Sequence, residues 1–282
     1  CVRDRATQTG EVRRWLARID AARTPAQIRA LIPALAAIGV DPFFSYSGQP
    51  DPQDLQRYRG EIDSSSTWQD AAIVERTFVL AGLAPDHAKA DAAAVKGLID
   101  ELRKHRASGD DPSLYENPRS WAQIQAMAPA IDWPAYFRAV GARPDRLVNL
   151  TSKGYLPAVS HELTTRSPEA LRAYLRWSFL FSLRGELPAP HNQAFGDLPA
   201  WGRVDLGSPA RACRDATVRA MGVEFSRQYA LHILGLPARE AALQVARSIQ
   251  GEIVKAVGDA GWLSPEARAA TADKLARTLL AQ

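Results

Sequence analysis

Several features that would assign this chain to a function class are missing from its sequence. No run of about 18 apolar residues occurs, so no segment has the length of a membrane-spanning helix. The 35 lysines and arginines are scattered among 31 acidic residues, so the net charge of +4 is not gathered into the basic surface of a nucleic-acid-binding protein. Only two cysteines occur, which excludes a disulfide-rich scaffold but allows one stapling pair.

Catalytic motifs are missing as well, since the chain has no H-E-x-x-H, no G-x-S-x-G and no Gly-rich phosphate loop. The nearest segment to a zinc motif is His161-Glu162-Leu163-Thr164-Thr165. Thr165 stands where a second imidazole would have to share the ion, so we interpret the segment as a surface helix end. The sequence therefore predicts no catalytic, metal-binding or cofactor-binding residue. The remaining histidines, which show no metal-ligand spacing, are His87, His105, His191 and His232.

Helix starts are the clearest signals that are present. A hydroxyl at the cap followed by proline or by glutamine three residues later satisfies backbone amides that a helix leaves unpaired. Four segments have this pattern: Thr24-Pro25-Ala26-Gln27, Ser120-Trp121-Ala122-Gln123, Ser167-Pro168-Glu169 and Ser264-Pro265-Glu266. With 282 residues and 46% hydrophobic content, the chain can bury a continuous core.

Apolar spacing between these starts predicts a mainly α-helical fold. The segment from Leu171 to Leu183 is apolar on nearly every face and should be a central buried helix, and another helix is expected from about Arg214 to Ile233. Two strand-like runs flank the turn-rich connector Gly48-Gln49-Pro50-Asp51-Pro52, which predicts one small β-hairpin near residues 43–63. We expect residues 1–282 to form a single helical lobe.

Aromatic residues recur at helical spacing and could in principle line a pocket. Helical spacing is more typical of core packing, so we interpret them as core residues. The series comprises Trp121, Trp133, Tyr136, Phe137, Tyr174, Trp177 and Phe181.

An ordered series of short motifs resembles the N-terminal lobe of the neprilysin and endothelin-converting enzyme family of zinc metallopeptidases. Each motif is weak alone, but their order extends over nearly the whole chain. They are Cys1-Val2-Arg3-Asp4, Gly39-Val40-Asp41-Pro42-Phe43-Phe44, Tyr115-Glu116-Asn117-Pro118, Ile131-Asp132-Trp133-Pro134-Ala135-Tyr136, Tyr174-Leu175-Arg176-Trp177, Arg211-Ala212-Cys213 and Gly261-Trp262-Leu263-Ser264. The chain departs from the family pattern at Ser64-Ser65-Ser66-Thr67-Trp68 and at Leu206-Gly207-Ser208-Pro209.

The resemblance implies a lid lobe that helps to enclose a cavity for peptide substrates and restricts their size. Zinc and the groups that attack the peptide bond are then expected only in a catalytic lobe beyond Gln282, as part of the same precursor or as a separate chain, and the isolated chain is expected to be inactive. The departures leave a second hypothesis open, in which the chain is a binding or scaffold protein descended from such a lobe. A third, a self-contained hydrolase, has no nucleophile motif in its support.

The two cysteines occupy positions at which the resemblance implies a disulfide between Cys1 and Cys213. A lipid-modified first residue and a free thiol are the alternatives for Cys1. The resemblance also implies export to a periplasmic, cell-surface or extracellular location. Because no basic segment followed by an apolar one begins the chain, export would require a signal that has been removed or that precedes residue 1.

Overall fold

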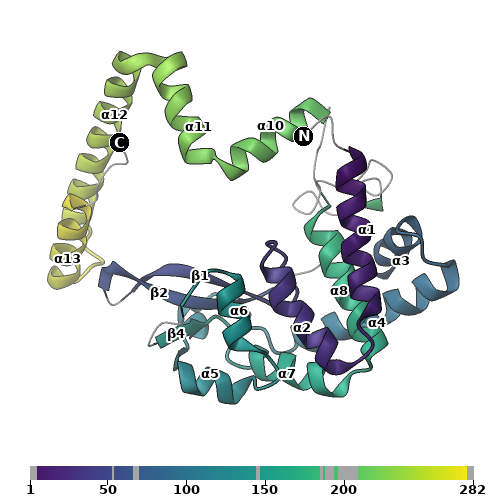
Figure 1. The fold of residues 1–282 in the computed structure, drawn as a ribbon. Helices are drawn as coiled ribbons and strands as arrows, with labels where there is room; N and C mark the ends of the chain where they lie inside the picture. Colours follow the sequence, from purple (N-terminus) through teal and green to yellow (C-terminus); the bar gives the residue numbers. More distant parts are fainter. Residues whose placement is uncertain are drawn as a thin grey trace. The chain divides into compact units, whose positions relative to one another are not determined.

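The structure, a computed structural model, describes residues 5–52, 54–65, 70–143, 147–184, 187, 194–195 and 209–277. The chain divides into two compact units, residues 1–207 and 208–282. The single lobe over residues 1–282 stays a prediction. Helices dominate the described residues of both units, as expected (Figure 1).

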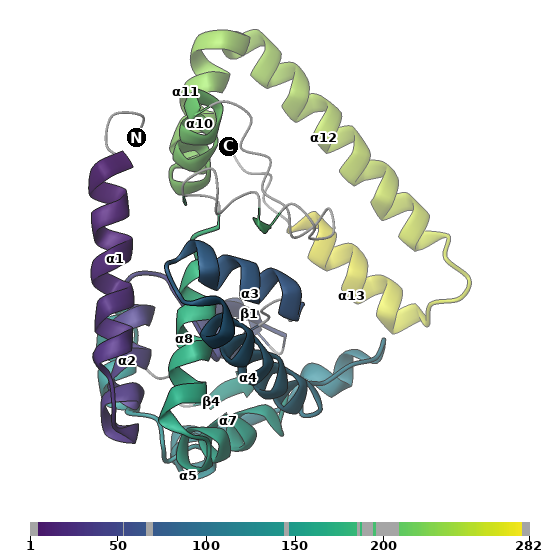
Figure 2. The ribbon, with the colours of Figure 1, turned by 90° about the vertical axis from the view of Figure 1, so that its right-hand side faces the viewer.

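The first unit is built around one buried helix, α8 (Pro168–Ser182), in which every residue from Leu171 to Phe181 is buried. Helices α1 (Arg5–Ala21), α2 (Pro25–Ala36), α3 (Ala71–Leu80) and α4 (Pro85–Arg103) all contact it. Figure 2 shows α1 and α4 on either side of α8. The prediction of a central helix in this region is confirmed.

Two arginines on α8 are buried among these apolar residues, and both have partners. Arg172 donates to the Ala22 carbonyl at 3.1 Å. Arg176 donates to Asp91 of α4 at 2.8 Å and to Asp20 of α1, so one guanidinium links three helices. A buried charge is tolerated when its hydrogen-bonding groups meet opposite charges, and here the pairing also fixes which helices lie against α8.

A small sheet lies beside these helices, and its strand order is β1-β2-β4-β3. Strands β1 (Phe44–Asp51) and β2 (Asp54–Ser64) form the predicted antiparallel hairpin. The expected connector was too long, because β1 continues through Gly48, Gln49 and Pro50. Proline is tolerated there because β1 is an edge strand of the sheet.

Two further strands, β3 (Pro118–Ser120) and β4 (Leu147–Leu150), extend the hairpin, and their existence was not predicted. Strand β4 pairs in parallel with β2 and antiparallel with β3. Asn149 is buried in β4, where its side chain donates to Glu61 and to the Tyr115 carbonyl and accepts from the Asn117 amide, all within 2.9 Å. These bonds join segments that are distant in sequence, so no local pattern could have revealed them.

Three more helices complete the described part of the first unit: α5 (Trp121–Met127), α6 (Trp133–Ala139) and α7 (Tyr155–Thr165). A single 3₁₀ turn covers Pro112–Tyr115. The aromatic series predicted to be core packs here and on α8. Trp133, Tyr136, Phe137, Tyr174, Trp177 and Phe181 are buried, and Trp121 is half-buried with its ring 5.0 Å from that of Phe137.

The second unit contains α10 (Pro209–Ala220), α11 (Gly222–Tyr229), a π-helical turn (Ala230–Leu234), α12 (Gly235–Gly258) and α13 (Pro265–Ala276). The prediction of a single helix from about Arg214 to Ile233 was wrong, because α10 ends before Met221 and α11 begins after it. Gly222 follows directly, and glycine is a poor helix former because it loses the most backbone entropy. Helix α13 folds back against α12, and the Gln250 side chain donates to the Leu275 carbonyl at 2.5 Å.

All four predicted helix starts are confirmed. Thr24 and Ser120 form complete capping boxes with Gln27 and Gln123, in which each side chain bonds the other residue's backbone. Ser167 accepts from the Ala170 amide, and Ser264 accepts from the Ala267 amide.

Candidate functional site

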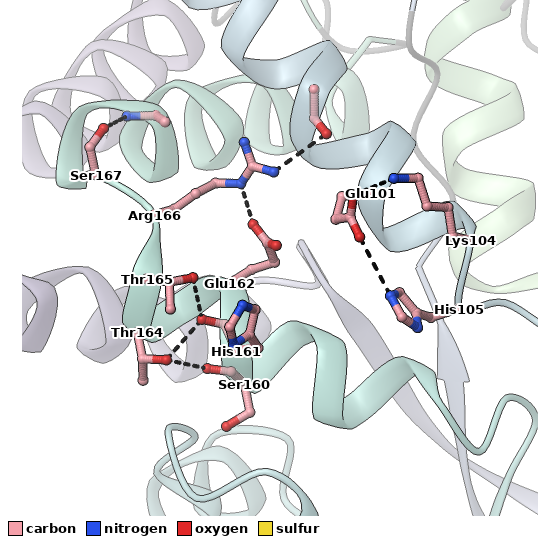
Figure 3. Close-up of polar contacts among 12 residues, drawn as sticks. Glu101, Lys104, His105, Ser160, His161, Glu162, Thr164, Thr165, Arg166 and Ser167 are labelled. Carbon is pink, nitrogen blue, oxygen red and sulfur yellow. Dashed lines mark hydrogen bonds and ion pairs between the residues drawn. The ribbon is translucent and has the colours of Figure 1, made fainter.

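The segment closest to a zinc motif occupies the second half of α7 (Figure 3). Glu162 is buried rather than exposed, so the prediction of a simple surface helix end was wrong for this residue. Its carboxylate accepts a hydrogen bond from Arg166 Nε, and the same guanidinium donates to the Gly97 carbonyl of α4 at 3.5 Å. Glu162 therefore takes part in an ion pair that ties the end of α7 to α4.

The residues around His161 do not fit a zinc ion. The His161 ring is exposed, whereas the Glu162 carboxylate is buried against Arg166. The Thr165 hydroxyl donates to the His161 backbone carbonyl at 2.8 Å, which completes a local helix contact (Figure 3). Zinc bound by a pair of imidazoles needs both rings on one helix face, and position 165 cannot provide the second.

The other histidines are separate from one another. His105, just after α4, has its Nε2 atom 3.6 Å from Glu101 Oε1 in the last turn of that helix. The His232 ring contacts the Gln228 carbonyl at 3.1 Å. His87 is exposed, and His191 lies outside the described residues. Within the described ranges, no three side chains of the types that bind metals come together.

A small cleft at the end of α4 is the feature that the sequence did not reveal. The cleft is small and open to solvent, and the centres of water-sized molecules can occupy about 20 Å³ within it. Its polar lining comes from Ser65, Arg103, Arg106 and the hydroxyl-bearing Tyr155 and Tyr174, and Ile99 and Leu102 form the apolar wall. These residues come from the position after β2, from α4 and the turn after it, from the first turn of α7 and from the middle of α8.

Tyr155 and Tyr174 differ in their hydrogen bonding within this cleft. The Tyr174 hydroxyl donates to the Pro42 carbonyl, so it is already engaged. Tyr155 is only 3% exposed, and no hydrogen bond of its hydroxyl is found within the described part of the chain. Burial raises the pKa of Tyr155 well above its ordinary value, and the nearby Arg106 charge opposes part of that rise. The hydroxyl is therefore protonated at neutral pH and able to donate.

The second unit has a different unusual feature, an apolar stripe on α12. Val245, Ile249 and Ile253 are spaced by four residues and are 59%, 56% and 45% exposed. Residues four apart lie on one helix face, so the three side chains form a continuous row. Other large exposed apolar residues in this unit are Met221, Val223, Phe225, Tyr229, Leu231, Ile233, Leu236 and Trp262. Exposed apolar surface of this extent is typical of an interaction surface.

The predicted disulfide falls partly outside the described residues. Cys213 lies in α10, whereas Cys1 is not among the residues that the structure describes. The pairing of Cys1 with Cys213 stays a prediction. None of the helices in the described ranges combines the length and hydropathy that a membrane span requires.

Comparison with known proteins identifies close likeness in fold to zinc metalloproteases. A sequence profile described as peptidase family M13, for its N-terminal domain, matches residues 3–279. The zinc metalloprotease Zmp1 of Mycobacterium tuberculosis in its open state is 19% identical with a TM-score of 0.74, and the match covers 94% of this chain and 45% of Zmp1. PepO from Lactobacillus rhamnosis HN001 is 18% identical with a TM-score of 0.77, over 95% of this chain and 46% of PepO.

A second structure of Zmp1, in complex with an inhibitor, is 21% identical with a TM-score of 0.72. That match covers 93% of this chain and 43% of the Zmp1 chain. The chain thus spans less than half the length of the solved structures that it resembles. No match to a curated protein sequence is found.

Proposed function

The chain belongs to peptidase family M13, and from this premise we propose that it forms the lobe of an exported zinc metallopeptidase that encloses the peptide-binding cavity and supplies no catalytic group. The observation that carries this proposal is the extent of the match. Residues 3–279 correspond to the family's N-terminal domain, and the fold covers 94% of this chain but 45% of Zmp1. The resemblance noted from the sequence motifs is thereby confirmed at the level of the family.

In this proposal the zinc and the water-activating groups belong to a catalytic lobe. The fit of this chain's own residues supports that division, because the Glu162 carboxylate is held by Arg166 and Thr165 replaces a second imidazole. The lobe's contribution is steric: together with its partner it would admit peptides and exclude folded proteins. When bound in the catalytic lobe, zinc would activate the water that attacks the peptide bond.

We further propose that the stripe of Val245, Ile249 and Ile253 on α12 is a surface against which the catalytic lobe packs. The three side chains are about half exposed, so burying the remaining area of each would contribute about 0.7–1.5 kcal/mol, half of the value for a fully exposed side chain. The solved structures that resemble this chain are more than twice its length, so such a protein contains a further lobe that could cover the stripe.

One experiment tests the proposal as a whole. The reading frame is followed past Gln282, and the chain is produced with whatever follows it. We expect an H-E-x-x-H helix downstream, zinc at one ion per molecule, and cleavage of short peptides but not of folded proteins. A stop codon directly after Gln282 would favour the scaffold hypothesis. Zinc and peptidase activity in the isolated chain, lost on His161→Ala, would overturn the proposal.

The stripe is tested in the same full-length protein by replacing Val245, Ile249 and Ile253 with serine. We expect the melting temperature and peptidase activity of the two-lobe protein to fall, while the isolated 282-residue chain keeps its melting temperature. A matched control replaces three exposed residues on the opposite face of α12, namely Glu240, Gln244 and Arg247, with serine. An equal loss in the isolated chain would show instead that the stripe packs within it or against a second copy.

A further inference from the structure

We propose that the cleft at the end of α4 binds a carboxylate group, with Arg106, Arg103 and the Tyr155 hydroxyl as its donors. The cleft lies within the first unit, and its lining comes from four segments of the chain. The site uses no residue of the stripe on α12.

The first argument is the Tyr155 hydroxyl. Tyr155 is 3% exposed and lines the cleft. Among the described residues, no hydrogen bond of its hydroxyl is found. The hydroxyl oxygen is not one of the fully buried side-chain atoms, so it opens into the cleft, where a water or a ligand can accept its hydrogen bond. The neighbouring Tyr174 hydroxyl, in contrast, has a protein partner, because it donates to the Pro42 carbonyl.

The second argument is the charge of the cleft. Arg103 is the last residue of α4, and Arg106 follows three residues later, so both guanidinium groups reach the same rim. Neither side chain has an ion pair or hydrogen bond within the described residues. The nearest acidic side chain that acts on Tyr155 is Asp63, whose carboxylate accepts from the Thr151 hydroxyl at 2.5 Å. The rim thus carries more positive than negative charge.

The lining of the cleft suits a carboxylate on an apolar stem. Ile99 and Leu102 line one wall, which suits the apolar stem of an acidic side chain or of a C-terminal residue. Arginine pairs with a carboxylate through parallel N–H···O bonds, and a tyrosine hydroxyl can donate to the same group. The ligand could be an acidic side chain or a free C-terminus, because both present the same group on an apolar stem.

The test uses the 282-residue chain and short peptides at low salt, followed by nuclear magnetic resonance. The probes are acetyl-Ala-Asp-Ala-amide, its Asn counterpart, acetyl-Ala-Ala with a free C-terminus, and inorganic phosphate. We expect the Asp peptide, the free C-terminus or both to shift signals of residues 103–106 and 155, and the Asn peptide to shift none. Binding by only one of the first two identifies the source of the carboxylate.

Variants then test the donors. Arg106→Gln should weaken carboxylate binding about tenfold, because it removes a charge-assisted hydrogen bond at a partly solvated rim. Tyr155→Phe should weaken it about threefold to tenfold while keeping the ring in the core, and Arg103→Gln provides a second test on the exposed rim. Arg138→Gln, on the exposed face of α6, is the matched control and should leave binding unchanged.

Three results would overturn the proposal. Equal binding of the Asp and Asn peptides would show that charge is not recognised. Unchanged affinity in both arginine variants, with folding verified by circular dichroism, would place the ligand elsewhere. Binding of phosphate alone would show that the cleft recognises a different anion.

Discussion

Substituting Gly60 by alanine should destabilise the first unit, because the Tyr46 ring occupies the space that a Cβ atom needs. A Cβ at position 60 would lie 2.3 Å from Tyr46 Oη and 2.7 Å from Cε2. Tyr46 holds this position by an edge-to-face contact with Phe137 at 5.0 Å and by donating to the Arg143 carbonyl at 3.4 Å. The alanine methyl must therefore displace the ring from both contacts.

The magnitude follows from what the ring loses. An aromatic pair contributes about 0.5–1.5 kcal/mol and a neutral hydrogen bond about the same. Replacing glycine by alanine returns about 0.4–1 kcal/mol, because the unfolded chain becomes less flexible. We expect Gly60→Ala to lower the free energy of unfolding by about 1–2 kcal/mol, measured by urea unfolding with tryptophan fluorescence.

A double-mutant cycle with Tyr46→Ala isolates the cause. Without the ring, alanine at position 60 meets no obstacle, so Gly60→Ala should then be neutral or slightly stabilising. A coupling free energy near zero between Gly60 and Tyr46 would refute the argument. The matched control is Gly48→Ala, since a Cβ at position 48 would lie 3.8 Å from its nearest neighbour, an ordinary contact distance.

Three further predictions concern charges and the cysteines. Arg176→Met should lower the free energy of unfolding by about 2–4 kcal/mol, because it leaves Asp91 and a second carboxylate without their guanidinium, and Asp91→Asn should remove part of that loss in a double-mutant cycle. Burial raises the pKa of Asp41 from 3.8 to about 6, and the nearby Tyr136 hydroxyl lowers it in part. The folded chain then binds this proton more tightly than the unfolded chain, so the contribution of Asp41 to stability is present below about pH 4 and is lost as the pH rises through about 6. Asp41→Asn should therefore raise the free energy of unfolding by about 1–2 kcal/mol relative to wild type at pH 8, after a discount for the partial exposure of Asp41, and should leave it unchanged at pH 4. Equal gains at both pH values would contradict this. If Cys1 and Cys213 are paired, reduction should cost at most about 4–5 kcal/mol from loop entropy, and two free thiols in non-reducing mass spectrometry would exclude the pair.

Local signals in the sequence were sufficient for most of the helices. Thr24, Ser120, Ser167 and Ser264 each accept the backbone amide that their position predicts, because capping depends only on residues within one turn. The burial of α8 was predicted from its nearly continuous run of apolar residues. Even so, the sequence did not indicate how the two arginines within that run are neutralised, since their partners lie on α1, on α4 and in the turn after α1.

Long-range pairing accounts for what the sequence did not predict. Strands β3 and β4 have three and four residues, too few to show alternation. The buried Val148 and Leu150 anchor β4 in the core, and the side-chain bonds of Asn149 join it to segments that are distant in sequence. The cleft at the end of α4 has the same origin, because Ser65, Arg106 and Tyr155 meet only after the sheet and α7 are in place. Glu162 was misassigned for a related reason, as its burial depends on Arg166 and on the position of α4.

The apolar pattern of α12 shows a second limit of prediction from sequence. Periodicity identifies an apolar helix face, but it does not identify what covers that face. Leu243 and Val254 are half-buried and lie on the same helix face as Gln250, whose side chain bonds to α13. The stripe that includes Ile249 lies on another face and remains about half exposed, although its residues are as apolar as those beside α13. Both faces follow the same helical period, so the sequence alone cannot separate them. The structure separates them, and membership in a family whose solved relatives are more than twice as long supports a catalytic lobe as the partner of the exposed face.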